Sequence, residues 1–443
     1  MKAYRASLLW FAPHSEGPAR ALFEEDGLLV VGPNAQGVQV VQAIGPWRTV
    51  APKFPDVAVE HLPGRIIAPG FVDLHVHFPQ TNVIGSPAPG LLPWLENYTF
   101  PEEKRFEIPE YSAQAATFFI AELLRNGVTT ALTFATSHTE SVDALFTEAQ
   151  ARRLRLITGL CLMDRHAPSD LLNQGRGTTD GTEQSLLDSE ALIQRWHCVD
   201  RLGYAITPRF APTSTDAQLR GAGALAARYP DVWIQSHVAE NKDEIAWARE
   251  LFPASRSYLA TYDDFGLMRE RAIYAHCIHF DDDDCALMRS TGAAAAISPT
   301  SNLFLGSGFF DYAGADRVGY QYGLASDVGG GTSFSPFHTM LAAYYVGREG
   351  QTKTGLSLSP QHLWWQHTAG AARALGLGGE GGAPSIGNLL PGCEADFVVL
   401  NPQATPLLAR KTALASSLDE LLFSMIVLGD DRLVERTVIS QAI

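Results

Sequence analysis

Short β-rich segments alternate with helical ones from about residue 70 onward, and this alternation restricts the fold more than any other feature of the sequence. In the helical stretch 112–127, Ser112 occupies a cap position, apolar residues recur at helical spacing and a glycine ends the run. Eight strands are expected, at residues 71–78, 128–137, 154–163, 202–210, 232–238, 272–278, 293–298 and 322–327. Alternating strands and helices form parallel βα units, and eight units predict an α/β fold with a (β/α)8 TIM-like barrel rather than an open sheet.

The two ends of the chain have a different pattern. Residues 1–68 and 383–443 are strand-like and rich in turns, and neither segment shows a helical period. We expect them to combine into one small β-sandwich domain beside a catalytic barrel at 69–375. The glycine-rich stretch 376–382 is interpreted as the linker between them, because the lysine and helix that a phosphate-binding loop needs do not follow it.

Composition excludes several classes of protein. The formal net charge of −15, without a cluster of Lys or Arg, argues against nucleic acid as a partner. No apolar run approaches the ~20 residues that cross a bilayer, so no membrane partner is expected. The five cysteines include no Cys-x-x-Cys pair and the N-terminal segment lacks a signal-peptide pattern, so we expect a cytoplasmic location. The acidic run 281–284 is expected to be the solvated start of a helix rather than a cation site.

A His-Val-His pair ends the first predicted strand, within PGFVDLHVHFPQ (69–80). Residues i and i+2 of a strand face the same side, so His75 and His77 can bind one metal ion. Alone, such a pair is more often structural. Three further strand ends carry suitable side chains: His237 followed by Glu240, His276, and Asp327. Because the carboxyl ends of barrel strands converge on one face, these residues together predict a metal site.

Imidazoles with one carboxylate are the ligands of a catalytic zinc or related divalent ion that keeps one position for water. Such an ion lowers the pKa of its water to ~7. A carboxylate beside the metal is suited to moving protons, and Glu240 is placed for this role. Outside this context Glu240 would be interpreted as a solvated loop residue, which is what we expect of Lys242, Asp243 and Glu244.

Seven segments resemble guanine deaminases of the amidohydrolase superfamily, in order along nearly the whole chain: PGFVDLHVHFPQ (69–80), WLENYTFPEE (94–103), TPRFAPT (207–213), SHVAEN (236–241), YAHCIHF (274–280), SPTSNLFLGSG (298–308) and SDVGGGTSFS (326–335). The histidines, the aspartate and the closing GNLLPGCEADFVVL (387–400) indicate the superfamily. Gln80, the WLENYTFP stretch and Pro-Arg-Phe at 208–210 are the narrower signals that indicate the substrate.

The resemblance implies a hydrolase that acts on a C–N bond of a cyclic amidine and deaminates guanine to xanthine and ammonia with a metal-activated water, as part of purine catabolism. It implies one Zn²⁺ per subunit, or Fe²⁺, and a homodimer. The implied metal ligands are His75, His77, His237 and Asp327. The implied catalytic residues are Glu240 as proton shuttle, His276 and Asp327. The implied substrate contacts are Gln80, Trp94, Arg209, Phe210, His237 and Glu240.

The substrate contacts suit a purine, because Arg209 can donate to a carbonyl oxygen, Gln80 can donate and accept along a base edge, and Phe210 can stack on the ring. Each also has a structural alternative: a surface ion pair for the arginine, a turn for the glutamine and packing for the phenylalanine. Trp94 is expected to wall the pocket or to pack within its loop.

Two other functions remain open. An amidohydrolase that deaminates a pterin, a triazine or an oxidised purine would share the metal site, although Pro-Arg-Phe and WLENYTFP favour guanine. A metal-free barrel kept for binding or assembly would be expected to have lost a ligand, and none is missing. The chain reads SPTSN (298–302) where relatives often carry Cys-Pro-x-Ser-Asn, so Asn302 is left outside the predicted site. The segment 79–111 is a hypothetical lid.

Overall fold

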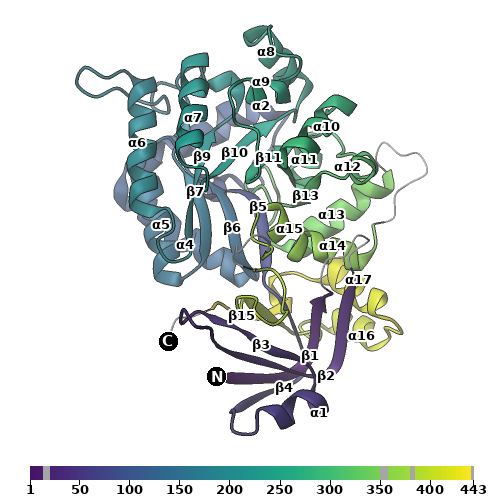
Figure 1. Ribbon diagram of the computed structural model, residues 1–443. Coiled ribbons are helices and arrows are strands. Elements are labelled where there is room, and N and C mark those ends of the chain that lie inside the picture. The colour runs from purple at the N-terminus through teal and green to yellow at the C-terminus, as the bar shows by residue number, and fades with distance from the viewer. Residues whose placement is uncertain (13–19, 350–357, 380–384, 441–443) are drawn as a thin grey trace.

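The computed structural model describes residues 1–12, 20–349, 358–379 and 385–440 and consists of a barrel above a smaller sheet (Figure 1). The barrel strands follow one another in sequence order: β5 (Phe71–His77), β6 (Val128–Phe134), β7 (Arg155–Gly159), β9 (Leu202–Pro208), β10 (Trp233–Val238), β11 (Ala272–His276), β12 (Ala294–Ile297) and β13 (Gln321–Leu324). The short β8 (Cys161–Leu162) also pairs with β9. Neighbouring barrel strands are parallel, and each coincides with a predicted segment, so the predicted barrel is confirmed.

The first and last barrel strands are joined at their carboxyl ends. The Asp327 backbone N–H donates to the carbonyl oxygen of His75 over 2.8 Å. The buried carboxylate of Asp73, on β5, accepts from the backbone N–H of Ser326 at 3.0 Å and from its hydroxyl at 2.5 Å. These bonds fix the strand that carries His75 and His77 against the segment that carries Asp327.

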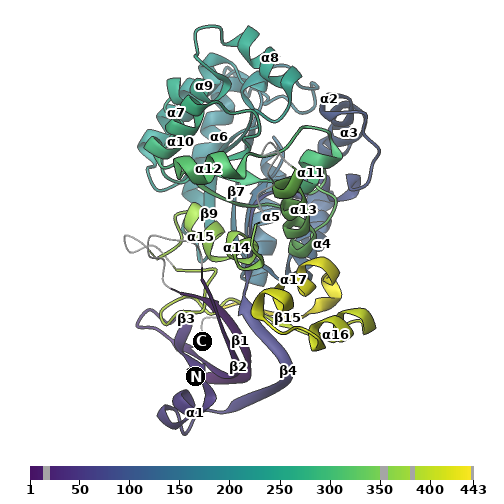
Figure 2. The ribbon, with the colours of Figure 1, turned by 90° about the vertical axis from the view of Figure 1, so that its right-hand side faces the viewer.

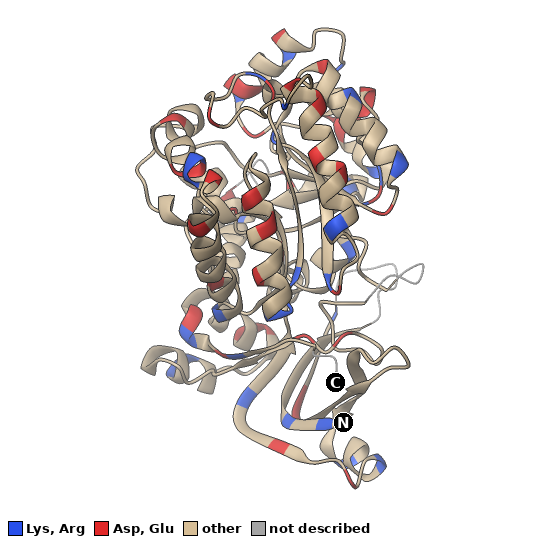
Figure 3. Cartoon of the chain, turned by 90° about the vertical axis from the view of Figure 1, so that its left-hand side faces the viewer, with Lys and Arg blue, Asp and Glu red and all other residues tan. Residues whose placement is uncertain are grey.

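Helices surround the barrel (Figures 1 and 2): α4 (Pro109–Arg125), α5 (Thr139–Arg152), α6 (Gly181–Trp196), α7 (Asp216–Arg228), α8 (Lys242–Leu251), α9 (Tyr258–Asp264), α10 (Asp282–Thr291), α11 (Pro299–Phe304), α12 (Tyr312–Val318), α13 (Pro336–Glu349), α14 (Pro360–Gln366) and α15 (Ala369–Ala374). Figure 3 shows acidic and basic positions interspersed along the outer helices of one side. None of the helices in the described ranges combines the length and the apolar character that a bilayer crossing requires.

Two predicted helix starts have different outcomes. The cap expected at Ser112 is wrong, because α4 begins at Pro109, which suits a first turn since it lacks an N–H, and Ser112 instead donates to the carbonyl of Phe106 at 2.8 Å. The acidic run does begin a helix, because the Asp281 side chain accepts from the backbone N–H of Asp284 and caps α10. The expected helix start is confirmed, and Asp281, Asp282 and Asp283 are exposed as predicted, whereas Asp284 is buried.

The small sheet combines both ends of the chain, as predicted. Its order is β15 (Val434–Val438), β14 (Phe397–Leu400), β4 (Val59–Pro69), β1 (Lys2–Phe11), β2 (Ala21–Pro33) and β3 (Gln39–Pro46), and a short helix, α1 (Trp47–Val50), follows β3. The C-terminal segment also contains two helices that the strand-like interpretation missed, α16 (Pro406–Ala413) and α17 (Leu418–Leu428). Figure 1 shows α17 between the barrel and the sheet.

Buried ion pairs connect the barrel to the small sheet. Arg155, on β7, lies 2.6 Å from Glu394, and Arg201, just before β9, lies 3.0 Å from the same carboxylate and also pairs with Asp396. The domain boundaries at 1–68, 69–375 and 383–443 stay a prediction. Part of the expected linker, residues 380–384, lies outside the described residues.

The segment after β5 covers the carboxyl ends of the strands. It forms a 3-10 helix at Phe78–Val83, α2 (Leu91–Trp94), a π-helical turn at Leu95–Thr99 and α3 (Phe100–Glu103). Figure 2 shows α2 and α3 at the upper edge of the barrel, close to α11. Trp94 packs there in an apolar cluster with Leu305, which follows α11. This segment therefore roofs the face on which the predicted ligands meet.

Candidate metal centre and active site

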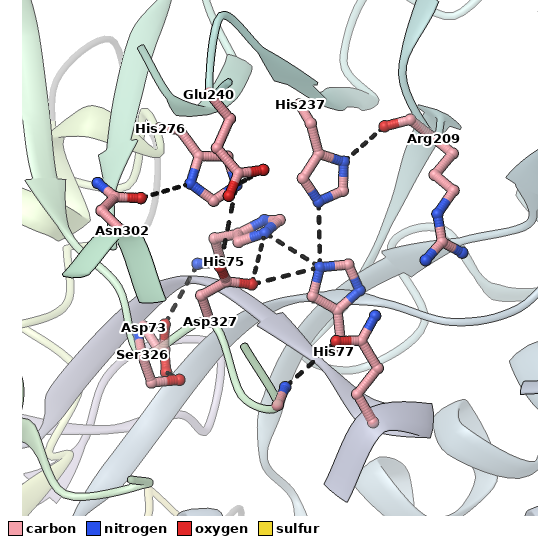
Figure 4. Close-up of polar contacts among 12 residues, drawn as sticks. Asp73, His75, His77, Arg209, His237, Glu240, His276, Asn302, Ser326 and Asp327 are labelled. Carbon is pink, nitrogen blue, oxygen red and sulfur yellow. Dashed lines mark hydrogen bonds and ion pairs between the residues drawn. The ribbon is translucent and has the colours of Figure 1, made fainter. Parts of the chain in front are cut away.

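Three imidazoles and one carboxylate meet at the carboxyl ends of the barrel strands. His77 Nε2 lies 3.2 Å from His75 Nε2 and 3.1 Å from His237 Nε2. Asp327 Oδ1 lies 3.1 Å from His75 Nε2 and 3.4 Å from His77 Nε2. Figure 4 shows the three rings turned toward one another beside the aspartate. The four predicted metal ligands are thus brought together by β5, β10 and the segment after β13.

The protonation of this cluster suits a cation. His237 Nδ1–H donates to the backbone carbonyl of Arg209 at 2.5 Å, which leaves the Nε2 lone pair facing the other rings. Burial holds the pKa of His77 and of His237 well below the usual value, so both rings are neutral. Burial alone would raise the pKa of Asp327, but neighbouring His75 and other rings lower it to about 2. Neutral imidazoles with one carboxylate are the donor set that a divalent ion such as zinc requires.

A second acidic group lies next to this cluster. Glu240 is 3% exposed, and its Oε2 lies 3.4 Å from His276 Nε2. Its Oε1 accepts a hydrogen bond from the hydroxyl of Ser307 at 2.9 Å. Burial raises the pKa of Glu240 above the ordinary carboxyl value. A buried carboxyl of raised pKa that bears no bond to the predicted metal ligands can take up and release a proton.

The ring of His276 is fixed by a residue left outside the predicted site. Asn302 Oδ1 accepts a hydrogen bond from His276 Nδ1 at 2.8 Å, which turns Nε2 toward Glu240 and Asp327. Burial would lower the pKa of His276, but the nearby carboxylates raise it. Although the residues before Asn302 depart from the Cys-Pro pattern, the contact of Asn302 with His276 is present. The position of Asn302 shortly after the seventh barrel strand, β12, was the sequence feature that could have placed it in the site.

A cavity adjoins the cluster, with about 440 Å³ of empty space when the part open to solvent is included. Predicted residues that line it are His77, Gln80, Trp94, Arg209, Phe210, His237, Glu240, His276 and Asp327. Unpredicted ones are Leu91, Leu95, Glu244, Ser301, Leu305 and Gly330. The predicted substrate contacts therefore share one cavity with three of the four predicted metal ligands, His77, His237 and Asp327.

A model of the amidohydrolase family matches residues 66–440. The chain belongs to the amidohydrolase family. Members of this family are generally metal-dependent hydrolases. The guanine deaminase of Escherichia coli (strain K12) is 42% identical to this amidohydrolase over 442 residues, which cover 99% of this chain and 96% of that protein.

Solved structures agree with this assignment. The structure of E. coli guanine deaminase matches this amidohydrolase with a TM-score of 0.91 at 41% identity, covering 99% of this chain and 98% of that one. A guanine deaminase from C. acetobutylicum, solved with guanine bound in its active site, matches with a TM-score of 0.87 at 27% identity, covering 99% and 98%. The barrel and its attached sheet are thus the fold of these enzymes.

Two buried carboxyl groups of this amidohydrolase were not recognised in the sequence. Glu244, expected to be solvated, is 1% exposed, and it accepts from the hydroxyl of Tyr258 at 2.7 Å and from the backbone N–H of Glu240 at 3.2 Å. Burial, followed by the charge of Glu240, raises the pKa of Glu244 to about 7. Glu103, at the end of α3, forms an ion pair with Arg209 at 2.5 Å. Only the fold brings Glu244 to the cavity wall and Glu103 to Arg209, which lines it.

A further group of possible ligands, His197, Cys198 and Asp231, lies away from this cavity. His197 Nδ1 accepts from the backbone N–H of Tyr204 at 3.0 Å, so the neutral ring carries its proton on Nε2, which donates to Asp231 at 3.1 Å. Both ring nitrogens are therefore occupied, and this group is explained by hydrogen bonding within the protein.

Proposed function

We propose that this protein is a guanine deaminase that converts guanine and water to xanthine and ammonia with one bound zinc ion. The observation that carries the proposal is the single cavity shared by the imidazole and carboxylate cluster, the buried Glu240 and the donors Gln80 and Arg209. Full-length similarity to guanine deaminases at 42% identity supports it, as does a related structure with guanine in its active site.

His75, His77, His237 and Asp327 are the residues proposed to hold the ion. A divalent ion supplies a water molecule whose pKa is lowered to ~7 and which can attack at neutral pH. Iron(II) would satisfy the same donors.

The reaction needs two proton transfers, and Glu240 is placed for both. As the water oxygen bonds to C2 of guanine, Glu240 takes one proton from the water and delivers it to ring nitrogen N3. Glu240 then takes the second proton of the former water and gives it to the amino group, the C2–N bond breaks, and ammonia leaves. The raised pKa of Glu240 suits a group that must hold a proton between these transfers.

The remaining residues bind and orient. His276 Nε2 faces Glu240 and Asp327, where it can hold the attacking water in line. Phe210, which is 6% exposed and lines the cavity, can stack on the purine ring. Arg209 and Gln80 can donate to acceptor atoms on the edge of the base. Apolar residues of the roof, Leu91 and Trp94, exclude bulk water from the reacting atoms.

The test is xanthine and ammonia formation by the zinc-loaded protein from guanine, with adenine, cytosine, a pterin and a triazine as competing candidates. We expect turnover of guanine alone. Glu240→Gln should reduce kcat by ~100-fold or more, whereas Glu250→Gln, an exposed position on α8, should not change it. Turnover of another heterocycle in place of guanine would refute the proposed substrate and leave the metal site standing.

The homodimer, the cytoplasmic location and the place in purine catabolism stay predictions. Closure of the roof segment 79–111 over a bound base is likewise a prediction. The cysteines in the described part of the chain are all free thiols, which supports a reducing compartment.

A further inference from the structure

Glu103 contacts two cavity-lining side chains that come from different parts of the barrel. Its Oε2 accepts from Arg209 Nη1 at 2.5 Å, and its Oε1 accepts from Arg209 Nη2 at 3.0 Å and from Gln80 Nε2 at 3.1 Å. All three side chains are buried, and Glu103 is 0% exposed. A carboxylate paired with a guanidinium only accepts hydrogen bonds, so each partner must turn an N–H toward it.

The amide of Gln80 is fixed from both ends. Nε2 faces the Glu103 carboxylate, and Oε1 accepts from the backbone N–H of Gly329 at 3.3 Å. A flipped amide would set its NH₂ group against the Gly329 N–H and its carbonyl against the Glu103 carboxylate, leaving buried polar groups unpaired. Gln80 therefore keeps one orientation, with a second Nε2–H still free to bind a ligand.

The guanidinium of Arg209 is fixed in the same way. Glu103 binds it through both terminal nitrogens, and the ring of Phe100 lies 5.3 Å from its Cζ atom. A guanidinium has five N–H groups and no acceptor, so whatever Arg209 presents to the cavity is a donor. Gln80 lines the same cavity, and the second N–H of its Nε2 is likewise a donor.

We propose that Glu103 is a positioning residue that fixes Gln80 and Arg209 as hydrogen-bond donors and thereby selects a purine with a 6-oxo group over one with a 6-amino group. This inference rests on the proposed function, because it concerns how the same cavity recognises guanine. A 6-oxo group accepts from both donors. A 6-amino group meets them donor to donor and leaves buried N–H groups unpaired, which costs at least about tenfold in binding.

The test compares hypoxanthine with adenine, which differ at position 6 and at the neighbouring N1 proton and both lack the 2-amino group. Their dissociation constants are measured by titration calorimetry with the zinc-loaded wild type and with Glu103→Gln. The replacement amide can donate as well as accept, so it no longer imposes one orientation on Gln80. The substitution also removes the negative charge that holds Arg209.

The matched control is Glu102→Gln. Glu102 is the neighbouring buried carboxylate on α3, but it binds Asn82, Arg105 and Tyr111 rather than Gln80 and Arg209. A second variant, Gln80→Met, keeps the Arg209–Glu103 pair and removes only the amide, so it tests the donor role of Gln80 on which the claim depends if Glu103→Gln does not fold.

We expect the wild type to bind hypoxanthine at least about tenfold more tightly than adenine, and Glu103→Gln to lower this ratio about tenfold or more. Gln80→Met should also lower it, and Glu102→Gln should keep it within about twofold. If Glu103→Gln folds and its ratio of adenine to hypoxanthine dissociation constants equals that of the wild type, the inference is overturned. If Glu103→Gln does not fold, an unchanged ratio in Gln80→Met overturns it. So does a wild type that binds both bases equally or neither.

These outcomes separate the inference from the proposed function. A wild type that discriminates between the two bases but forms no xanthine from guanine refutes the proposed function and leaves the role of Glu103 intact. A wild type that forms xanthine but shows an unchanged ratio in the variants refutes only the inference.

Discussion

The hydroxyl of Ser307 donates a 2.9 Å hydrogen bond to Oε1 of Glu240, while Oε2 of the same carboxylate lies 3.4 Å from His276 Nε2. The serine therefore occupies one oxygen of the proposed proton shuttle and leaves the other facing the site of reaction. A donor to a carboxylate favours its charged form, so Ser307 lowers the pKa of Glu240 against the effect of burial.

Replacing Ser307 with alanine should move the pH dependence of turnover. Without the donor, the pKa of Glu240 rises further, and Glu240 must be ionised to accept the first proton from water. The acid limb of the kcat profile should therefore shift to higher pH in Ser307→Ala, whereas Ser307→Thr, which keeps the hydroxyl, should retain the original profile. Coincident profiles for the alanine variant and the wild type would show that this bond does not tune the shuttle.

Asn302 should matter for turnover more than for binding. Asn302→Leu removes the acceptor of His276 Nδ1, so the ring is free to rotate and its pKa falls. We expect kcat to drop about tenfold or more with little change in KM. Asn302→Asp keeps an acceptor in the same place and should retain more activity than the leucine variant. Equal loss in both variants, or a loss confined to KM, would contradict a role in orienting His276.

Glu244 should make stability depend on pH. Its folded-state pKa of about 7 exceeds the ordinary value of 4.5, so between these values the folded state holds a proton that the unfolded chain releases. The contribution of Glu244 to the free energy of unfolding therefore falls by up to about 3 kcal/mol as the pH rises from about 4.5 to about 7. Above pH 7 it stays at this lower value.

Thermal denaturation across this pH range tests the sign. The Tm of Glu244→Gln relative to the wild type should increase from pH 4.5 to pH 7, because the variant lacks the titrating group. Asp243→Asn, at an exposed neighbouring position, should show no such trend. A constant difference in Tm between Glu244→Gln and the wild type would show that the buried carboxyl does not titrate in this range.

The barrel and the convergence of the candidate metal ligands could be predicted because both depend on the regular geometry of strands. Residues i and i+2 of a strand share a face whatever surrounds them, which is why His75 and His77 converge. Parallel strand ends meet on one face of a barrel, which adds His237 and Asp327. The helix α17 was missed because the run LLFSMIVL (421–428) is almost continuously apolar and has no clear helical period.

The buried carboxylates could not be predicted for a different reason. Glu102 and Glu103 are adjacent and chemically identical, yet only the second reaches Arg209, which lies 106 residues further along the chain. Glu244 follows two charged residues and resembles them in sequence, but α8 turns it toward Tyr258. Such contacts depend on how α3 and α8 pack over the barrel, and no local pattern encodes that packing.

The most direct test of the account is guanine turnover as a function of metal content. The protein is stripped with a chelator and dialysed, zinc is added back in steps, and xanthine formation is followed by ultraviolet absorbance, with Asp327→Asn treated in parallel. The account predicts no xanthine from the stripped protein, recovery that is complete at one zinc ion per chain, and neither zinc retention nor turnover in the variant. Full turnover by the stripped protein, or a fully zinc-loaded protein that forms no xanthine, would contradict it.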